Sequence, residues 1–165
     1  MIELAHDDPA IFALFVEWLY YGEYTIVPFQ APQPYTGPGR VSIDAECWVL
    51  GDKLLSTEFK GYAMRRLYNQ HVTTMFSRPI STHDVQFASE NSPETSRLRQ
   101  FFVHLAATNI GNQNQVQGTL DEWDKILLSH SDLRRLLLEH VRSQPLEWRI
   151  IRSEEYYVQD EVAAP

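Results

Sequence analysis

The segment from Asp8 to Gly22 predicts a helix that is apolar on two faces, and this feature constrains the fold more than any other. Asp8 can accept hydrogen bonds from the unpaired amides of a first helical turn, and Pro9 suits the first helical position because it has no amide hydrogen to leave unpaired. Gly22 stands where a left-handed residue commonly ends a helix. Within Ala10–Tyr21 the only charged residue is Glu17. Because a helix of this kind is normally covered on all sides, it needs more than one packing partner.

The two apolar faces differ in what they are expected to contact. The first face has the spacing i, i+3, i+4, i+7 and i+8 of a core-facing stripe and consists of Ile11, Leu14, Phe15, Trp18 and Leu19. The second face carries Phe12, Val16 and Tyr20. Tyrosine and tryptophan dominate binding hot spots, so Tyr20, Tyr21 and Tyr24 are candidates for binding anchors as well as for the core. We expect Trp18 to lie in the core.

The rest of the chain predicts a mainly helical fold, a bundle-like array with at most one short strand. We expect a strand at Glu23–Val27, followed by an exposed loop at Pro28–Arg40. Two helices are then expected, from Ser42 to about Leu55 and from Phe59 to about Gln70. Further helices are expected to begin at Ser81, Ser92, Thr119 and Ser131, with a polar connector at Asn109–Gly118. Gly51 lies within a predicted helix, where close approach of a neighbouring helix is the simplest reason to tolerate it. We predict that the chain divides into an N-terminal segment at 1–72, a helical extension at 73–152 and a flexible acidic tail at 153–165.

Charge and composition exclude several classes of function. The net charge is −8, which disfavours capture of nucleic acid phosphates. No apolar stretch approaches the roughly 20 residues that a membrane span needs. The chain has one cysteine, Cys47, and no basic leader followed by an apolar core, so we expect residence in the cytoplasm or nucleus.

Catalytic motifs are weak in this sequence. It has no phosphate loop, dinucleotide fingerprint, nucleophile elbow or histidine pair of the zinc-protease type. The group His6-Asp7-Asp8 is better explained by helix capping than by metal binding, so neither a metal nor a cofactor is predicted. A cofactor-free hydrolase or transferase that uses Cys47 or the His83-Asp84 pair is the alternative function, although Cys47 lies on an apolar stripe where cysteine is usually a small hydrophobe.

Two arginine pairs, Arg65-Arg66 and Arg134-Arg135, are candidates for an anion site. Each pair lies off the apolar stripe of its helix, which is typical of a solvated face. We therefore expect both pairs to be solvated.

The order of two motifs resembles a known family. Asp7-Asp8-Pro9, Phe12 and the run Phe15–Tyr24 (FVEWLYYGEY) resemble the "D-D-P, F, W-L-Y-T-G-x-Y" stretch of BTB/POZ domains, particularly those of filamentous-fungal proteins. The run Trp48–Leu54 (WVLGDKL), with Phe59 and the pairs Ala63-Met64 and Leu67-Tyr68, is similar to the next helical hairpin of that family. The resemblance covers roughly residues 2 to 70, and residues 98–102 are similar to a segment that follows the domain in fungal members.

The resemblance implies a protein–protein interaction module. A complete BTB/POZ domain begins with strands and a helical hairpin, so we expect this chain to correspond to the C-terminal half. Family members dimerise through the N-terminal part, and many recruit a cullin scaffold of ubiquitin ligases, for which the helix at Asp8–Tyr21 and the following loop resemble part of the docking surface. The sequence holds no clean hydrophobic-x-Glu docking motif between Pro28 and Glu46.

In the complete domain, the helix at Asp8–Tyr21 is covered from two directions. With one cover absent, the Phe12, Val16 and Tyr20 face would expose hundreds of square ångströms of apolar surface, a size associated with interaction or aggregation. We therefore predict a non-catalytic module that binds a protein partner or a second copy of itself, as an adaptor in ubiquitin ligation or transcriptional complexes. The predicted partner-binding residues are Phe12, Val16, Tyr20, Tyr21 and Tyr24.

Overall fold

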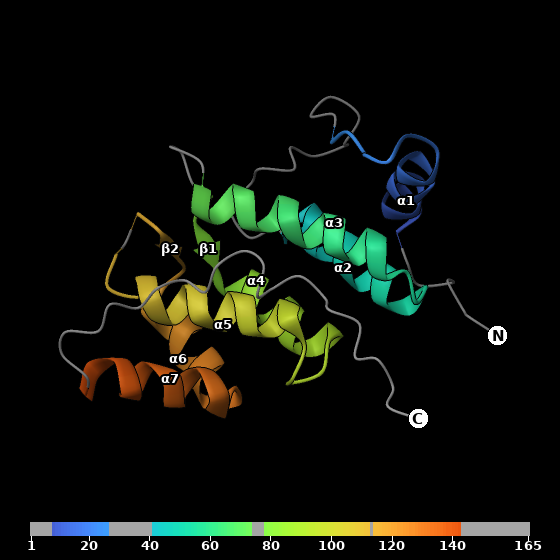
Figure 1. The fold of residues 1–165 in the computed structure, drawn as a ribbon. Coiled ribbons are helices and arrows are strands. Elements are labelled where there is room, and N and C mark those ends of the chain that lie inside the picture. The colour runs from blue at the N-terminus through green and yellow to red at the C-terminus, as the bar shows by residue number, and fades with distance from the viewer. Residues whose placement is uncertain (1–7, 27–40, 74–77, 113, 143–165) are drawn as a thin grey trace.

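The computed structural model describes residues 8–26, 41–73, 78–112 and 114–142, and these form a mainly helical fold, as predicted (Figure 1). Two short parallel strands, β1 (Ile80–Ser81) and β2 (Val116–Gln117), pair with Ile80 opposite Val116. The helices are α1 (Pro9–Tyr21), α2 (Ile43–Lys53), α3 (Thr57–Tyr68), α4 (Thr82–Asn91), α5 (Arg97–Asn109), α6 (Leu120–Ser129) and α7 (Ser131–Arg142), with a π-helical turn, η1 (Asn69–Thr73), after α3.

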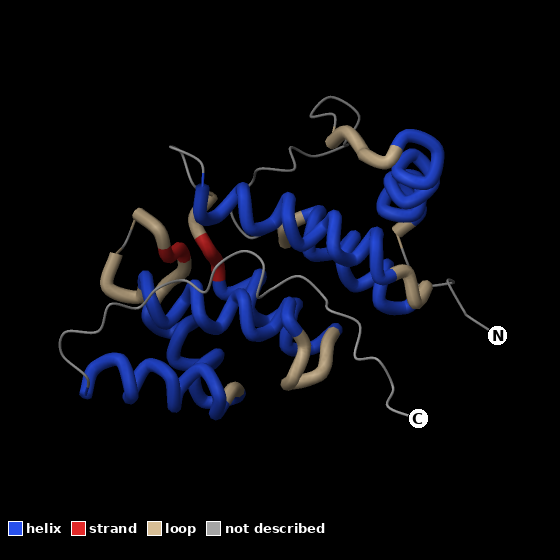
Figure 2. Tube along the Cα trace, in the orientation of Figure 1, coloured by secondary structure: helices blue, strands red, loops and turns tan. Residues whose placement is uncertain are grey.

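The helices pack as a hairpin with an array beside it. Helices α2 and α3 form the hairpin, α1 lies against it at one end, and α6 and α7 lie at the other end of the molecule (Figures 1 and 2). Helix α5 packs against α4 and α7, and α4 also contacts α6. The buried residues form one hydrophobic cluster that runs from Ile11 to Leu133. Described residues on both sides of position 72 therefore share one core. Within the described ranges, no helix combines the length and apolarity that a membrane span requires.

Helix α2 approaches α3 closely at Gly51, as predicted. A Cβ atom at this position would lie 3.1 Å from the backbone nitrogen of Lys60 and 3.1 Å from Cδ1 of Phe59. Both distances are shorter than ordinary van der Waals contacts. The glycine thus lets the backbones of the two helices come together.

Local capping signals in the sequence correctly marked several helix ends. The Asp8 carboxylate accepts from the Ala10 amide at 2.8 Å, and Gly22 ends α1 in the left-handed conformation with φ of 73°. Capping boxes pair Ser81 with Asp84 at the start of α4 and Thr119 with Glu122 at the start of α6. In each box a hydroxyl and a carboxylate satisfy amides that the helix itself leaves unpaired.

The predicted strand at Glu23–Val27 is wrong for its described part, residues 23–26, which form no strand. Here the Thr25 amide donates to the Glu17 carboxylate at 3.1 Å, and the Tyr24 side chain turns into the core. A backbone donor held by a side chain of the preceding helix does not take part in a strand ladder. Val27, the predicted loop at 28–40 and the predicted tail from residue 153 lie outside the described residues.

Two further boundaries differ from the sequence-based expectation. Helix α5 begins after Ser96, whose hydroxyl accepts from the Arg99 amide at 3.1 Å, and not at Ser92. The Ser92 hydroxyl instead donates to the Ala88 carbonyl at 2.6 Å, at the end of α4. The connector after α5 also contains β2, which is too short to leave a periodic signal.

Candidate functional site

Helix α1 is attached to the core by the predicted inner stripe. Ile11 is buried, and Phe15 and Trp18 pack around the buried ring of Phe59. The ring centroids of Phe15 and Trp18 lie 5.0 and 5.2 Å from that of Phe59. These distances are typical of favourable aromatic pairs. The stripe therefore fixes α1 on the α2–α3 hairpin.

The opposite side of α1 exposes large apolar residues. We use the name "α1 outer face" for Phe12, Val16, Leu19 and Tyr20, which follow helical spacing. Tyr20 is 80% exposed and Leu19 is 59% exposed, while Phe12 is also exposed and Val16 is half-buried. Tyr21 is exposed at the end of the helix, with its ring 6.5 Å from that of Tyr20.

The α1 outer face carries no charged residue. The one charged residue within α1, Glu17, points its carboxylate at the Thr25 amide. These apolar side chains adjoin one another along the helix and are not scattered singly over the surface. Four of the predicted partner-binding residues, Phe12, Val16, Tyr20 and Tyr21, thus lie on α1 away from its packed stripe.

Leu19 does not pack with the stripe to which its spacing assigned it, and its side chain is exposed. At about 100° per residue, Leu19 lies about 80° from Ile11 around the helix but only about 20° from Phe12. It therefore lies beside Phe12 rather than beside Ile11. A helical-wheel count would have assigned it to the α1 outer face.

The prediction that Tyr24 is a binding anchor is wrong, because this residue is buried in the core. Its hydroxyl donates to the Asp44 carboxylate in a short hydrogen bond, and its ring packs edge-on against Phe59 and Tyr62. Tyr24 follows α1 by only a few residues, and Asp44 lies in the first turn of α2. The hydrogen bond therefore ties the chain that leaves α1 to the hairpin.

Asp44 is the centre of a buried polar cluster, which we call the Asp44 cluster: Tyr24, Asp44, Arg66 and Gln70. The Asp44 carboxylate accepts from Arg66 Nε at 2.9 Å and from Gln70 Nε2 at 2.6 Å, as well as from Tyr24. Arg66 Nη1 also donates to the Tyr24 carbonyl at 3.2 Å, and its guanidinium lies 4.6 Å from the centre of the Tyr24 ring. The prediction that Arg66 belongs to a solvated pair is therefore wrong, whereas Arg65 is exposed.

Burial and pairing shift the pKa values within this cluster in physically distinct ways. Burial raises the pKa of Asp44, and the hydrogen bonds from Tyr24 and Arg66 oppose that rise. Burial, with the nearby Asp44 charge, raises the pKa of Tyr24, which stays a hydroxyl donor. Burial alone would lower the pKa of Arg66, but the Asp44 carboxylate outweighs it and the net shift is upward. The upward pKa shifts of Tyr24 and Arg66 keep both groups protonated, as donors to Asp44.

The His83-Asp84 pair does not form an acid–base dyad. Asp84 is fully buried and accepts from the Ser81 amide at 3.0 Å and hydroxyl at 2.8 Å, and from the Ser42 amide at 3.2 Å. Arg78 lies 3.5 Å from the same carboxylate. His83 is exposed. The Asp84 carboxylate therefore joins the start of α2 to the start of α4.

Cys47 is fully buried on the inner side of α2. Burial raises the pKa of its thiol, and the nearby Asp44 charge raises it further. A nucleophilic cysteine needs a lowered pKa and access to solvent. Cys47 is thus packed as a small hydrophobic residue.

Comparison with protein-family models, with curated proteins and with solved structures finds no match for this chain.

Proposed function

We propose that this chain is a non-catalytic protein–protein interaction module that binds its partner through the α1 outer face. The observation that carries the proposal is the exposure of Phe12, Leu19 and Tyr20 on one uncharged side of a single helix. Exposed apolar patches of several hundred square ångströms are typical of interaction sites. Tyr20 is a suitable anchor because tyrosine offers a large contact area with few rotatable bonds.

The attachment of α1 also supports this proposal. Phe15 and Trp18 hold the helix on one side, and the Tyr24 hydrogen bond to Asp44 holds the chain at its C-terminal end. A surface that is already ordered loses less conformational entropy on binding. The α1 outer face is therefore preorganised for a partner that supplies a complementary apolar surface.

The resemblance to BTB/POZ domains favours the same conclusion, because that family consists of protein-binding modules. In this interpretation the chain is an adaptor in ubiquitin ligation or in transcriptional complexes. The partner is a second protein or a second copy of this chain. The contacts of Cys47 and of the His83-Asp84 pair give no comparable support for a hydrolase or transferase.

The proposal is tested by placing the photocrosslinker p-benzoylphenylalanine at Tyr20, and at exposed Gln86 on α4 as a control. Irradiation in cells should give a discrete crosslinked protein from position 20 and none from position 86. Sedimentation velocity of the purified chain shows whether the captured protein is a second copy.

A charge on the α1 outer face should weaken the association. With the crosslinker placed at the neighbouring exposed residue Leu19 instead, Tyr20→Asp should abolish the crosslink and leave the far-UV circular dichroism unchanged, because Tyr20 is mostly exposed. Leu138→Asp on α7 is the matched control, since Leu138 is equally an exposed apolar residue. Equal crosslinking by both variants, or the same products from positions 20 and 86, would refute the proposal.

A further inference from the structure

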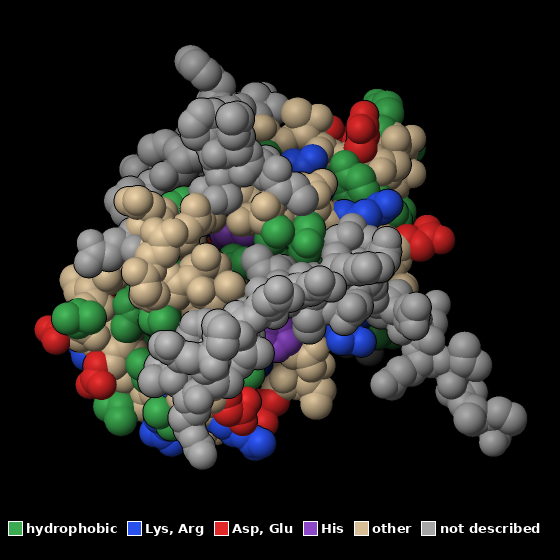
Figure 3. Space-filling view, turned by 60° about the vertical axis from the view of Figure 1, so that its left-hand side comes forward, with side chains coloured by type: hydrophobic (Ala, Val, Ile, Leu, Met, Phe, Trp, Pro, Cys, Tyr) green, Lys and Arg blue, Asp and Glu red, His purple; other side chains and the backbone are tan. Residues whose placement is uncertain are grey.

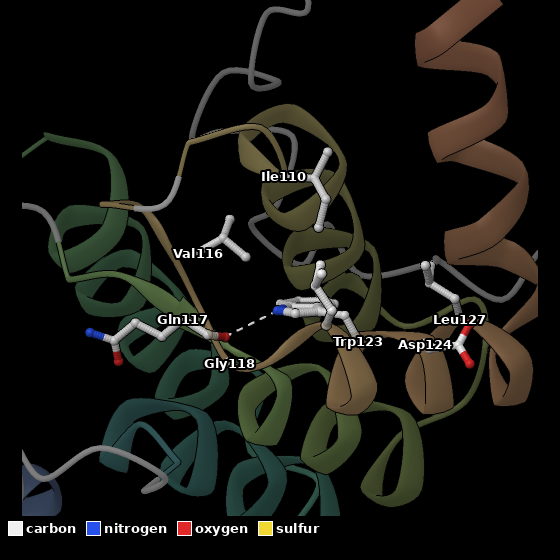
Figure 4. Close-up of a pocket in the computed structure, with 8 residues that line it drawn as sticks. Ile110, Val116, Gln117, Gly118, Trp123, Asp124 and Leu127 are labelled. Carbon is white, nitrogen blue, oxygen red and sulfur yellow. Dashed lines mark hydrogen bonds between the residues drawn. The ribbon is translucent and has the colours of Figure 1, made fainter.

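A second apolar surface lies at the end of the molecule opposite α1. A hollow of about 710 Å³ opens between the end of α5, the connector that contains β2, and α6 (Figure 4). This volume falls in the range of pockets that bind small molecules, and it exceeds the volume of a single large side chain. The apolar part of its lining consists of Ile110, Val116, Leu120, Trp123 and Leu127.

The indole of Trp123 is held in place at the centre of this hollow. Its Nε1 donates to the Gln117 carbonyl at 3.1 Å, a contact drawn in Figure 4. Gly118 has φ of +123°, and a Cβ atom there would lie 3.1 Å from the same Nε1. A side chain at this position would therefore be strained and would crowd the indole. The glycine allows the connector and Trp123 to form a preorganised wall.

Helix α6 turns two leucines and one carboxylate toward this hollow. Leu120, Asp124 and Leu127 have the spacing i, i+4 and i+7 and share one side of the helix. Leu120 is 88% exposed, and Leu128 next to Leu127 is also exposed. The capping box that starts α6 uses Thr119 and Glu122, so Leu120 has no part in it. An exposed leucine at the edge of an apolar hollow gains burial only when a partner covers it.

The charges along the hollow are acidic. Asp124 is the one charged residue among the described residues that line it, and Asp121 lies one helical turn earlier on the exposed side of α6. In Figure 3, which brings the side with β1, β2 and α6 forward, exposed hydrophobic side chains lie beside both acidic and basic ones. A carboxylate next to an apolar hollow favours a partner with a positive charge next to an apolar group.

We propose that this hollow, the α6 hollow, docks a short peptide segment of a partner protein that carries a large apolar side chain flanked by lysine or arginine. The apolar side chain enters between Val116, Trp123 and Leu127, and the flanking cation pairs with Asp124. Leu120 closes over the inserted side chain. This surface is separate from the α1 outer face, which lies at the other end of the fold (Figure 1).

The experiment uses the full chain and three synthetic fluorescein-labelled peptides. The first is GKLFKKG-amide, the second has serine in place of its leucine and phenylalanine, and the third has glutamate in place of its lysines. Fluorescence anisotropy gives the affinities. Proton–nitrogen correlation NMR then follows the indole Nε1–H of Trp123, which is assigned with the Trp123→Phe variant.

We expect saturable binding of the first peptide alone, with a shift of the Trp123 indole signal. Leu120→Ser should weaken this binding about fivefold or more, because it removes one anchor contact without disturbing the core. Asp124→Lys should weaken it by about threefold at low salt and by less at high salt. Leu138→Ser and Glu90→Lys are matched controls for lost apolar surface and changed charge, and each should bind like wild type.

Three results would overturn the proposal: no saturable binding, equal binding of the serine or glutamate peptide, or equal affinity in Leu120→Ser and wild type. Signal shifts that cluster on α1 and leave the Trp123 indole unchanged would also overturn it, because the peptide would then occupy the α1 outer face.

Discussion

Replacement of Asp44 by alanine is the strongest single test of how the fold is held together. Asp44→Ala removes the acceptor for the Tyr24 hydroxyl, for Arg66 Nε and for Gln70 Nε2. Tyr24 is buried and has no route to water, whereas the Arg66 side chain is 30% exposed and can recover some hydration. The free-energy cost of the substitution should therefore come mainly from the unpaired Tyr24 hydroxyl and from the buried part of the Arg66 guanidinium.

The magnitude follows from these contacts. An unpaired buried hydroxyl costs about 1–3 kcal/mol, and loss of one partner of a buried ion pair costs about 3–5 kcal/mol. Partial exposure of Arg66 reduces the cost of its lost partner below the range for a fully buried pair, so we expect Asp44→Ala to lower the free energy of unfolding by about 3–4 kcal/mol. This is a large share of the roughly 5–15 kcal/mol that stabilises an ordinary domain.

Urea unfolding followed by far-UV circular dichroism measures this change. Asp52→Ala is the matched control, because Asp52 lies on the same helix and its carboxylate is 2.8 Å from Lys60 Nζ, but its side chain is 44% exposed. We expect that control to lose about 0–1 kcal/mol. A difference of less than 1 kcal/mol between the two variants would contradict the view that the Asp44 cluster is a buried, paired network.

Three further predictions concern single sites. Burial lowers the pKa of His71 to about 4, below the unfolded value of about 6.5. The folded state therefore holds the imidazole neutral, and the stability that this gives is complete above pH 6.5 and is lost as the pH falls toward 4. The loss should reach about 3 kcal/mol in unfolding titrations, and His71→Phe should flatten that part of the pH curve. Gly51→Ala should destabilise the fold by about 1 kcal/mol, because overpacking against the Lys60 backbone outweighs the gain in helix propensity. Gly61 has open space around it, so Gly61→Ala should stabilise the fold by a similar amount in the same unfolding assay. The Cys47 thiol should react with Ellman's reagent only as fast as the chain unfolds, and rapid labelling of the native protein would show that it is accessible.

Helix positions were predictable from the sequence where a cap and an apolar stripe coincide. The Asp8 cap, the Gly22 cap and the two capping boxes Ser81-Asp84 and Thr119-Glu122 are local signals, because each contacts only the helical turn beside it. The β1–β2 pair was not predictable, since two-residue strands have no period. Its pairing depends on contacts between residues more than 30 positions apart.

The Asp44 cluster was also beyond sequence reasoning, and the cause is the distance along the chain between its members. Arg66 and Gln70 are four residues apart and share a side of their helix, which is the one signal the sequence contained. Nothing local indicates that this side meets an aspartate from α2. A charged residue was assigned to solvent because most charged residues are exposed, and that rule fails when a partner from another helix is buried with it.

The buried cluster and the exposed face of α1 are connected through Tyr24. If Tyr24 had remained on the surface, as its sequence neighbours Tyr20 and Tyr21 do, the chain after α1 would lose its hydrogen bond to the hairpin. Its burial places Asp44 and Arg66 in direct contact with the segment that leaves α1. The orientation of α1 is therefore set by the aromatic stripe on Phe59 and by this polar anchor together. Two attachments of different chemistry hold the helix from one side, and Phe12, Leu19 and Tyr20 on the other side stay exposed.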